Sequence, residues 1–485
     1  MRILLASSEI WPFAKTGGLA DVAGALPKAL AKLGIEIRVI MPKYKGIEER
    51  GFPLVYKNNR VSCPISQTSV SAEIVESQYD GIKVYLVEKD EYYYRDFLYA
   101  TQDGDYLDNA ERFVFFSKSI LEAIKVTGYV PDVLHCNDWQ TSLVPVFLGT
   151  AYQKDPVLSS ISTLLTIHNL GYQGIFWHLD WHLLNLGWEH FTPDCLEFYG
   201  KINFLKGGIV FSDLVNTVSK KYSEEIQTPE FGYGLDGILR TRKNDLYGIV
   251  NGIDYEEWSP EADKYLPSNY SLANLADKRR CKAALQEAFS LPVGPDIPVI
   301  ASISRLADQK GFDLVASALD EMLGLNIQYI MLGTGERKYN ELFPQLAKNH
   351  RTSFAVKVAY DNALAHLIEA GADMFLMPSL YEPCGLNQLY SLRYGTVPIV
   401  RGVGGLEDTI MDDPRRPNAN TGFKFYDYTE EAMLGAIRRA CKAYENKASW
   451  LSLVKRCMQQ DFSWEASARA YSDLYEKAIR KHGLR

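Results

Sequence analysis

The sequence lacks the features of an exported or membrane-spanning chain. Its first residues, MRILLASSEIWPF, carry one basic residue and a short apolar run of strand length. A signal peptide would need a longer apolar core and a small-residue cleavage site. No uninterrupted apolar run approaches the ~20 residues that span a bilayer. We therefore expect a cytoplasmic protein with no membrane partner.

Paired cysteines and an excess of basic charge are also missing. The seven cysteines are scattered and show no Cys-x-x-Cys spacing, which argues against a disulfide framework or a structural zinc site. Lys and Arg total 52 against 60 Asp and Glu, so the formal net charge is −8. Proteins that bind nucleic acids usually carry a basic excess. We therefore expect no nucleic-acid partner.

The order of apolar runs predicts an α/β protein. A chain of 485 residues exceeds the roughly 250–300 that one core holds, so two domains are expected. Runs such as MFLMPS and VPIV are apolar at successive positions, which is typical of parallel strands covered on both faces. Helical stretches such as Ala20–Leu33 supply the crossovers, and the pattern occurs twice. The expected strands are Ile3–Ala6, Ile37–Met41, Val84–Val87, Val133–His135, Leu164–His168, Val215–Val218 and Gly248–Val250, then Val299–Ile303, Ile327–Leu332, Phe354–Val358, Met374–Met377 and Val397–Val400.

The break between the domains is expected at a polar segment. NGIDYEEWSPEADKYLPSN (Asn251–Asn269) contains Gly and Pro and follows the last strand of the first half. We place one Rossmann-like domain at residues 1–250 and the other at residues 251–463. The pattern of the last helical stretch, Trp464–Lys481, suits either half, and we assign residues 464–485 to the first. Two doubly wound domains facing each other predict a ligand in a deep cleft between them, outside the carboxyl ends of the strands.

A glycine pair follows the first strand. The segment AKTGGLADV matches neither GxGxxG nor the P-loop. Gly17 and Gly18 nevertheless let the backbone approach an anion and begin a helix whose N–H groups attract phosphate, and Lys15 adds positive charge. The alternative interpretation is a plain glycine turn beside a solvated lysine.

The second half carries a cation pair and a carboxylate at strand ends. Arg305 and Lys310, in SRLADQKG, are able to neutralise a departing nucleoside diphosphate, although two unrelated surface cations are the alternative. Glu382 follows another strand and either accepts hydrogen bonds from sugar hydroxyls or offsets a helix dipole. Gly404 and Gly405 repeat the glycine pair of the first half.

Two further polar residues stand where strands of the first half stop. These are Asp138, in HCNDWQ, and His168, in TIHNLGYQG. A single residue of either kind is more often structural than catalytic. Their common location at the edge of the expected cleft favours a functional interpretation.

Together these segments resemble the bacterial glycogen synthases and the plant starch synthases. The resemblance runs in family order from Met1 to near Arg485, through KTGGLADV (Lys15–Val22), HNLGYQG (His168–Gly174), NGID (Asn251–Asp254), SRLADQKG (Ser304–Gly311), EPCGL (Glu382–Leu386) and VGGLEDT (Val403–Thr409). It implies the glycosyltransferase B fold and retaining transfer of glucose from ADP-glucose to the non-reducing end of an α-1,4-glucan such as glycogen. It also implies that neither a metal nor another cofactor takes part.

The resemblance assigns a role to each matching residue. In the second domain it implies phosphate binding by Arg305 and Lys310, glucose binding by Glu382, adenine stacking on Tyr360, and backbone contacts from Gly404, Gly405 and Leu406. In the first domain it implies that Lys15 and the backbone of Gly17 and Gly18 face the diphosphate, that His168 and Asn251 contact the sugar near its 6-hydroxyl, and that Asp21 and Asp138 line the donor and acceptor sides.

Two segments depart from the family pattern. Val403 stands where the family usually has Thr, so any contact from that hydroxyl is lost. EYYYRDFLY resembles an acceptor-side stretch but has Tyr94-Arg95-Asp96-Phe97 in place of a usual DRPG ending. Tyr93 is the acceptor contact that this stretch offers.

Three other classes of protein remain as alternatives. A glycosidase needs two carboxylates about 5–9 Å apart around one sugar, whereas Glu382 and Asp138 come from different domains. A sugar-nucleotide epimerase shares a diphosphate site but needs no polymer acceptor. A catalytically silent glucan-binding protein is expected to have lost some of Lys15, Arg305, Lys310 and Glu382, and all four are present.

Overall fold

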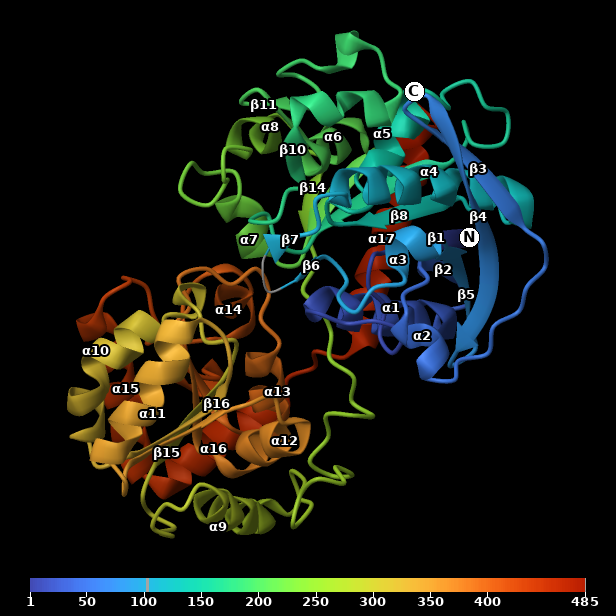
Figure 1. The fold of residues 1–485 in the computed structure, drawn as a ribbon. Helices are drawn as coiled ribbons and strands as arrows, with labels where there is room; N and C mark the ends of the chain where they lie inside the picture. Colours follow the sequence, from blue (N-terminus) through green and yellow to red (C-terminus); the bar gives the residue numbers. More distant parts are fainter. Residues whose placement is uncertain (102–103, 485) are drawn as a thin grey trace. The chain divides into compact units, whose positions relative to one another are not determined.

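The chain divides into two compact units, each with its own hydrophobic core. The computed structural model describes residues 1–101 and 104–484. Unit 1 comprises Met1–Gly252 together with the C-terminal segment from Trp464, and unit 2 comprises Ile253–Ser463 (Figure 1). This division, after Gly252, lies two residues beyond the boundary expected after residue 250. Among the residues described, none of the helices has the length and apolar character needed to cross a membrane.

Unit 1 is built on a nine-stranded sheet of order β14-β13-β9-β8-β1-β2-β5-β4-β3. Its strands are β1 (Arg2–Ala6), β2 (Glu36–Pro42), β3 (Arg60–Ile65), β4 (Thr68–Tyr79), β5 (Ile82–Glu88), β8 (Val133–Asn137), β9 (Ser162–Ile167), β13 (Leu214–Thr217) and β14 (Leu246–Gly248). The neighbours from β14 to β5 pair in parallel, whereas β3 and β4 extend the edge antiparallel. Smaller sheets are formed by β10 (Ile175–Trp177), β12 (Lys201–Asn203) and β11 (Glu197–Phe198), and by β6 (Ala100–Thr101) and β7 (Gly104–Asp105).

Helices cover the sheet of unit 1. They are α1 (Gly18–Lys32), α2 (Gly46–Glu49), α3 (Asp90–Tyr93), α4 (Asn109–Thr127), α5 (Leu143–Gly149), α6 (Phe204–Phe211), α7 (Lys220–Glu225), α8 (Asp236–Thr241) and α17 (Trp464–His482), with 3-10 helices η1 (His178–Leu184) and η2 (Trp188–His190). The C-terminal helix α17 packs on α1, β8 and β9, and is the red helix among the blue and green elements of Figure 1. The last helix therefore completes unit 1.

A buried polar network fastens α17 to the sheet. The two ring nitrogens of His135, on β8, lie 2.9 Å from the Tyr475 hydroxyl of α17 and 2.6 Å from the Thr166 hydroxyl of β9. His135 is fully buried, and burial lowers its pKa to about 3, so its ring is neutral at pH 7. The network thus joins helix and strands by hydrogen bonds without a buried charge.

Removal of the Tyr475 hydroxyl is expected to destabilise unit 1. In Tyr475→Phe one ring nitrogen of His135 loses its partner, and an unsatisfied buried polar group costs about 1–3 kcal/mol. Denaturant unfolding should show a lower midpoint for Tyr475→Phe. Tyr199→Phe, at a side chain that is 81% exposed, should leave the midpoint unchanged. Equal midpoints for both variants would contradict the role given to the network.

Unit 2 is a six-stranded parallel sheet of order β17-β16-β15-β18-β19-β20. Its strands are β15 (Val299–Ile303), β16 (Gln328–Gly333), β17 (Phe354–Val358), β18 (Met374–Met377), β19 (Val397–Arg401) and β20 (Phe423–Phe425). The helices are α9 (Lys278–Ala288), α10 (Phe312–Leu323), α11 (Arg337–Asn349), α12 (Asn362–Gly371), α13 (Asn387–Tyr394), α14 (Gly404–Thr409), α15 (Glu430–Glu445) and α16 (Lys447–Met458), with 3-10 helices η3 (Leu275–Asp277), η4 (Asp308–Lys310) and η5 (Pro417–Ala419). This is the strand order of a doubly wound fold.

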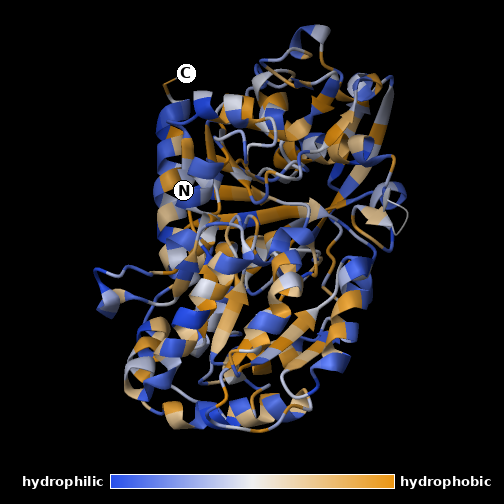
Figure 2. Ribbon diagram, turned by 90° about the vertical axis from the view of Figure 1, so that its left-hand side faces the viewer, coloured by the Kyte–Doolittle hydropathy of each residue, from blue (hydrophilic) through white to orange (hydrophobic). Residues whose placement is uncertain are grey.

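The expected fold class, two doubly wound α/β domains, is confirmed. Figure 2 shows the apolar residues concentrated in the strands, while the helices carry polar outer faces. The strands β15, β17 and β18 have the expected bounds, whereas β14 begins and ends two residues earlier than expected. The expected set omits β3 and β4. Their buried residues largely alternate with exposed ones, as in half-buried antiparallel strands, and this pattern is weaker than a continuous apolar run.

Candidate functional site

The candidate donor residues of unit 2 follow parallel strands at one edge of its sheet. Arg305 and Lys310 follow β15, Tyr360 follows β17, Glu382 follows β18, and Gly404–Leu406 follow β19. The order of strands reverses between β15 and β18. Ligands of open α/β sheets bind outside the carboxyl ends of the strands at such a switch point.

Two of these residues meet directly at the switch point. The Lys310 ammonium lies 2.6 Å from Oε2 of Glu382, and the Ser379 hydroxyl donates to the same oxygen at 3.1 Å. The Glu382 side chain is only 7% exposed and that of Lys310 is 21% exposed. A carboxylate held this deeply depends on its partners, because an isolated buried charge is costly.

Arg305 lies exposed in the same loop and contributes a second positive charge. Its guanidinium donates to Gln309 Oε1 at 3.2 Å. Among the residues that the structure describes, no carboxylate lies within ion-pair distance of Arg305. The guanidinium is therefore a cation that a bound anion is able to use.

The loop that carries Lys310 is fixed against the loop that carries Glu382. Gly311 has φ +76°, and a Cβ there would lie 2.0 Å from the carbonyl oxygen of Pro378, so only glycine fits. The Leu380 N–H donates to the Gln309 carbonyl at 2.9 Å. These contacts explain how residues far apart in the sequence come to form one ion pair.

The second glycine pair has a packing role that the sequence did not reveal. Gly404 has φ +45°, and its Cβ would lie 1.9 Å from the Glu382 carbonyl oxygen. The Gly405 N–H donates to the carbonyls of Glu382 and Pro383, each at 3.1 Å. The Leu406 N–H donates to the Val403 carbonyl at 3.0 Å. A ligand that used the N–H of Gly405 or Leu406 would have to share these bonds or replace them.

Tyr360 offers an accessible ring at the end of β17. Its side chain is 84% exposed. The exposed ring provides a surface on which a flat base is able to stack.

The candidate residues of unit 1 also share one edge of a sheet. The glycine loop follows β1, Asp138 follows β8, His168 follows β9, and Asn251 lies three residues beyond the end of β14. Here the strand order reverses between β1 and β8, so the glycine loop and Asp138 flank the switch point. The Asn251 side chain is buried, and its Oδ1 has no hydrogen-bond partner among the described residues. A buried oxygen of this kind is an acceptor that a ligand hydroxyl is able to satisfy.

Asp138 and His168 are linked across β8 and β9. Asp138 has φ +55°, and its Oδ1 accepts the His168 N–H at 2.7 Å. Burial raises the pKa of Asp138 to about 7, although the hydrogen bond from the His168 amide opposes this shift. Burial lowers the pKa of His168 to about 3, and its Nε2 lies 2.9 Å from Asn137 Oδ1. At neutral pH His168 is therefore a hydrogen-bonding group without charge.

The first glycine loop carries an ion pair. Lys15 Nζ lies 2.6 Å from Asp21 Oδ1, and both side chains are partly exposed. Burial raises the pKa of Asp21, and the Lys15 ammonium partly offsets that shift. The ion pair places the Lys15 side chain near the surface of unit 1, at the start of α1.

Gly17 does not present the free amide that the sequence suggested. Its N–H donates to Glu9 Oε2 at 3.3 Å, and the Thr16 N–H donates to the same oxygen at 2.5 Å. A phosphate that used the Gly17 N–H would have to share or replace this bond to Glu9, and phosphate binding by the glycine loop stays a prediction. Glu9 was missed in the sequence. The only signal was an acidic residue shortly after the first strand and just before the glycine loop.

Tyr93 lies in the core of unit 1. Its side chain is fully buried, and its hydroxyl donates to the Arg112 carbonyl at 2.9 Å. Its ring packs edge to face on Tyr44, with the ring centroids 6.0 Å apart. In this structure Tyr93 has a packing role and no face of its ring is open to a sugar. The acceptor contact suggested for Tyr93 stays a prediction.

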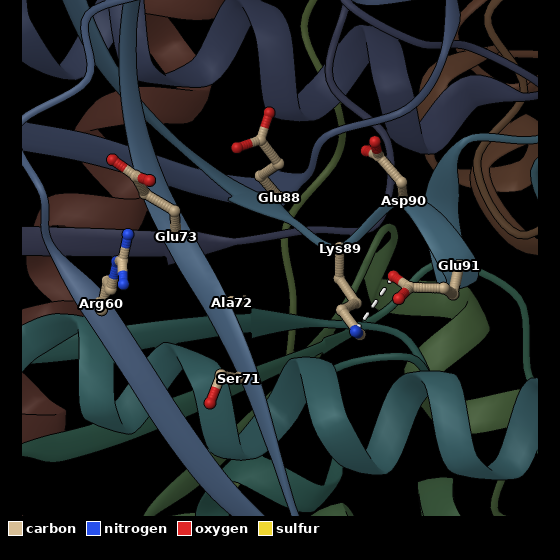
Figure 3. Close-up of a pocket in the computed structure, with 8 residues that line it drawn as sticks. All are labelled: Arg60, Ser71, Ala72, Glu73, Glu88, Lys89, Asp90 and Glu91. Atoms are coloured by element: carbon tan, nitrogen blue, oxygen red, sulfur yellow. Dashed lines mark ion pairs between the residues drawn. The ribbon is translucent and has the colours of Figure 1, made fainter.

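A pocket of about 320 Å³ lies elsewhere in unit 1, beside β3, β4 and β5 (Figure 3). None of the candidate residues lines it. Lys89 is already paired with Glu91 at 3.0 Å, and the remaining lining includes three more carboxylates and one arginine. This net negative charge opposes binding of a diphosphate. Its lining residues are Arg60, Ser71, Ala72, Glu73, Glu88, Lys89, Asp90 and Glu91.

Within residues 1–101 and 104–484, no three His, Cys, Asp or Glu side chains are grouped so that they could hold a metal ion. Lys15, Arg305 and Lys310 contribute positive charge at the carboxyl edges of the two sheets.

Comparison with known proteins identifies the family. Residues 2–241 match the model of the starch synthase catalytic domain, and residues 286–452 match that of glycosyl transferases group 1. The chain is 48% identical over 479 residues to a glycogen synthase of Koribacter versatilis, covering 99% of this chain and 98% of the relative. It is 46% identical over 486 residues to a glycogen synthase of Moorella thermoacetica, covering 99% and 97%.

This chain belongs to the glycogen and starch synthase family. It is therefore a glucosyltransferase of the glycosyltransferase B fold. Its structure matches the catalytic domain of starch synthase IV from Arabidopsis thaliana bound to ADP and acarbose, with a TM-score of 0.90, 31% identity and 99% coverage of each chain. A sucrose-phosphate synthase from Thermosynechococcus elongatus, at a TM-score of 0.59 and 17% identity over 99% of each chain, shares the fold.

Proposed function

We propose that this enzyme transfers glucose from ADP-glucose to the non-reducing end of an α-1,4-glucan such as glycogen, with retention of anomeric configuration and release of ADP. The observation that carries the proposal is the pairing of Lys310 with Glu382 at the switch point of unit 2, beside Arg305. Phosphate-binding cations thus adjoin a carboxylate suited to sugar hydroxyls. The ADP bound by the related starch synthase supports the choice of nucleotide.

In the proposed mechanism unit 2 stabilises the leaving group. Negative charge develops on ADP as the glycosidic bond breaks, and the preformed cations Arg305 and Lys310 oppose that charge. When Lys310 turns from Glu382 to the phosphate, the carboxylate is left to accept hydrogen bonds from the glucose hydroxyls. The exposed ring of Tyr360 stacks on the adenine.

Unit 1 is proposed to supply the groups around the transferred sugar and its acceptor. Lys15 faces the diphosphate, while neutral His168 and Asn251 bind near the sugar 6-hydroxyl, and Asp21 and Asp138 line the donor and acceptor sides. The acceptor hydroxyl attacks from the face that the diphosphate leaves, and the departing phosphate takes its proton. Exclusion of water directs the reaction to the glucan rather than to hydrolysis.

One assay tests this proposal against the alternatives. The protein is incubated with ADP-glucose and glycogen, and ADP release is followed together with chain extension. Equal amounts of ADP and incorporated glucose are expected. Free glucose released from glycogen would indicate a glycosidase, and an altered sugar nucleotide without chain growth would indicate an epimerase. Glycogen binding without ADP release would indicate a silent binding protein. Competition with UDP-glucose then tests the nucleotide preference.

Activity is expected to survive chelation. Because Lys and Arg supply the positive charge in the proposed mechanism, the diphosphate needs no metal ion. Turnover should be the same before and after dialysis against EDTA, with EDTA present in the assay. Loss of activity that Mg²⁺ or Mn²⁺ restores would overturn this part of the mechanism.

A cytoplasmic location and a neutral polysaccharide partner belong to the same proposal. In the described part of the chain the seven cysteines form no disulfide, and five of them are buried, as suits a reducing compartment. The net charge of −8 suits an uncharged glucan better than a nucleic acid.

A further inference from the structure

Glu9 is a buried carboxylate that the proposed mechanism does not use. Glu9 lies just beyond β1 and is only 4% exposed. Oε2 accepts the N–H of Thr16 at 2.5 Å and that of Gly17 at 3.3 Å. Oε1 accepts the Thr16 hydroxyl at 2.6 Å and the Tyr99 hydroxyl at 2.8 Å. Both oxygens are therefore engaged, chiefly by the glycine loop.

The charge on Glu9 is balanced by hydrogen bonds alone. Within the described part of the chain, no Lys or Arg lies within ion-pair distance of its carboxylate. Backbone N–H groups before a helix are the groups that bind an anion, and here the anion belongs to the protein. Removal of these donors would leave an unpaired buried charge, which is strongly unfavourable. The same bonds therefore hold the glycine loop in one conformation.

The loop held by Glu9 carries Lys15. Lys15 is the residue immediately before Thr16, and α1 begins at Gly18, immediately after the second bonded amide. The backbone on the C-terminal side of Lys15 is thus fixed by Glu9 and by α1. Displacement of a positioning group by about 1 Å is enough to cost on the order of 10²-fold in rate.

Glu9 also connects this loop to the loop after β8. The Tyr99 ring packs on Phe113, with centroids 5.9 Å apart, and Phe113 packs on Trp139 at 4.9 Å. Trp139 adjoins Asp138. The contacts therefore run from the glycine loop to both sides of the switch point between β1 and β8.

We propose that Glu9 is a positioning residue, whose carboxylate holds the amides of Thr16 and Gly17 and thereby directs Lys15 toward the donor diphosphate. This inference rests on the proposed function. Glu9 itself needs no contact with substrate, since it acts through Lys15.

The test is a double-mutant cycle between Glu9 and Lys15. Glu9→Gln keeps the shape of the side chain but removes its charge and replaces one acceptor oxygen by a donor. Its kcat/KM for ADP-glucose should fall by on the order of 10- to 10²-fold. In a Lys15→Met background the same change should cost less than about 3-fold, because residues that act as a unit are not additive. The cycle is repeated on the Kd of ADP, which does not depend on turnover.

A matched control separates positioning from loss of stability. Glu369 is a fully buried carboxyl group of unit 2 that accepts the Ser391 hydroxyl at 2.7 Å, away from the carboxyl edge of its sheet, and burial raises its pKa to about 8. Glu369→Ala, which removes this buried hydrogen bond, should lower the unfolding midpoint yet leave kcat/KM unchanged below that temperature. If Glu9→Gln fails to fold, Thr16→Val takes its place in the same cycle. This variant removes only the hydrogen bond from the Thr16 hydroxyl to Glu9 Oε1.

The outcomes are distinct. Equal losses from Glu9→Gln in both backgrounds, wild-type behaviour of Glu9→Gln, or wild-type behaviour of Lys15→Met would each overturn the positioning role. Failure of the proposed function shows instead in the unmodified enzyme, as no ADP released from ADP-glucose. In that case the cycle on ADP binding still decides whether Glu9 acts through Lys15.

Discussion

Replacement of Lys310 or Arg305 by alanine is expected to reduce turnover by on the order of 10²-fold or more, the scale for loss of a preorganised charge-stabilising group. Both cations are proposed to meet the charge that forms on ADP, which is larger in the transition state than in bound ADP-glucose. The loss should therefore appear in kcat as well as in kcat/KM. Initial rates of ADP release at saturating glycogen measure both constants.

The two variants differ in their effect on folding. Arg305 is exposed and, among the residues that the structure describes, its guanidinium is bonded only to Gln309, so Arg305→Ala should unfold like the unmodified enzyme. Lys310→Ala instead leaves Glu382 buried with Ser379 as its remaining bonded partner. We expect a loss of about 1–3 kcal/mol of stability there.

An equivalent ion pair at the opposite edge of the same sheet provides the control. Lys282 lies 2.7 Å from Asp373, which precedes β18, and both side chains are largely buried. Lys282→Ala should destabilise unit 2 without lowering kcat below the unfolding transition. Near-normal turnover in Lys310→Ala or Arg305→Ala would show that the phosphate role of that residue is wrong.

The sequence predicted most of what depends on local pattern. Continuous apolar runs such as Met374–Met377 are buried along their whole length, so their position and parallel pairing followed from composition alone. The position of the antiparallel strands β3 and β4 did not follow from composition, because mainly polar residues (Ser, Thr, Arg and Gln) occupy their exposed positions and dilute the apolar signal.

The sequence predicted only those features of the site that follow from the positions of the strand ends. Residues that follow parallel strands share an edge, and this brought Lys310 and Glu382 into one prediction although 71 residues separate them. Their direct contact was not foreseen, because it depends on how the two loops pack around Gly311. The buried carboxylate of Glu9 and the burial of Tyr93 were hidden for the same reason: long-range packing decides which side chains stay exposed.

The variant Glu382→Gln is expected to separate the binding of the donor glucose from the binding of the phosphates. Glu382→Gln should lower kcat/KM for ADP-glucose by on the order of 10²-fold, because hydrogen bonds from the glucose hydroxyls to a charged acceptor are stronger than those to an amide. Its affinity for ADP, which has no glucose, should stay the same or increase. The reason is that Lys310 loses its internal partner and a nearby negative charge disappears.

Kinetics and calorimetric titration with ADP, made on the same preparation, measure the two effects. Asp373→Asn breaks the matched ion pair at the other edge of the sheet and should change neither quantity at temperatures where unit 2 is folded. If Glu382→Gln lost ADP affinity and turnover in equal proportion, Glu382 would serve only to hold Lys310 in place. A normal turnover would remove Glu382 from the site altogether. Unchanged or tighter ADP binding together with slow transfer is the result expected of a carboxylate that binds Lys310 in the free enzyme and the donor glucose during the reaction.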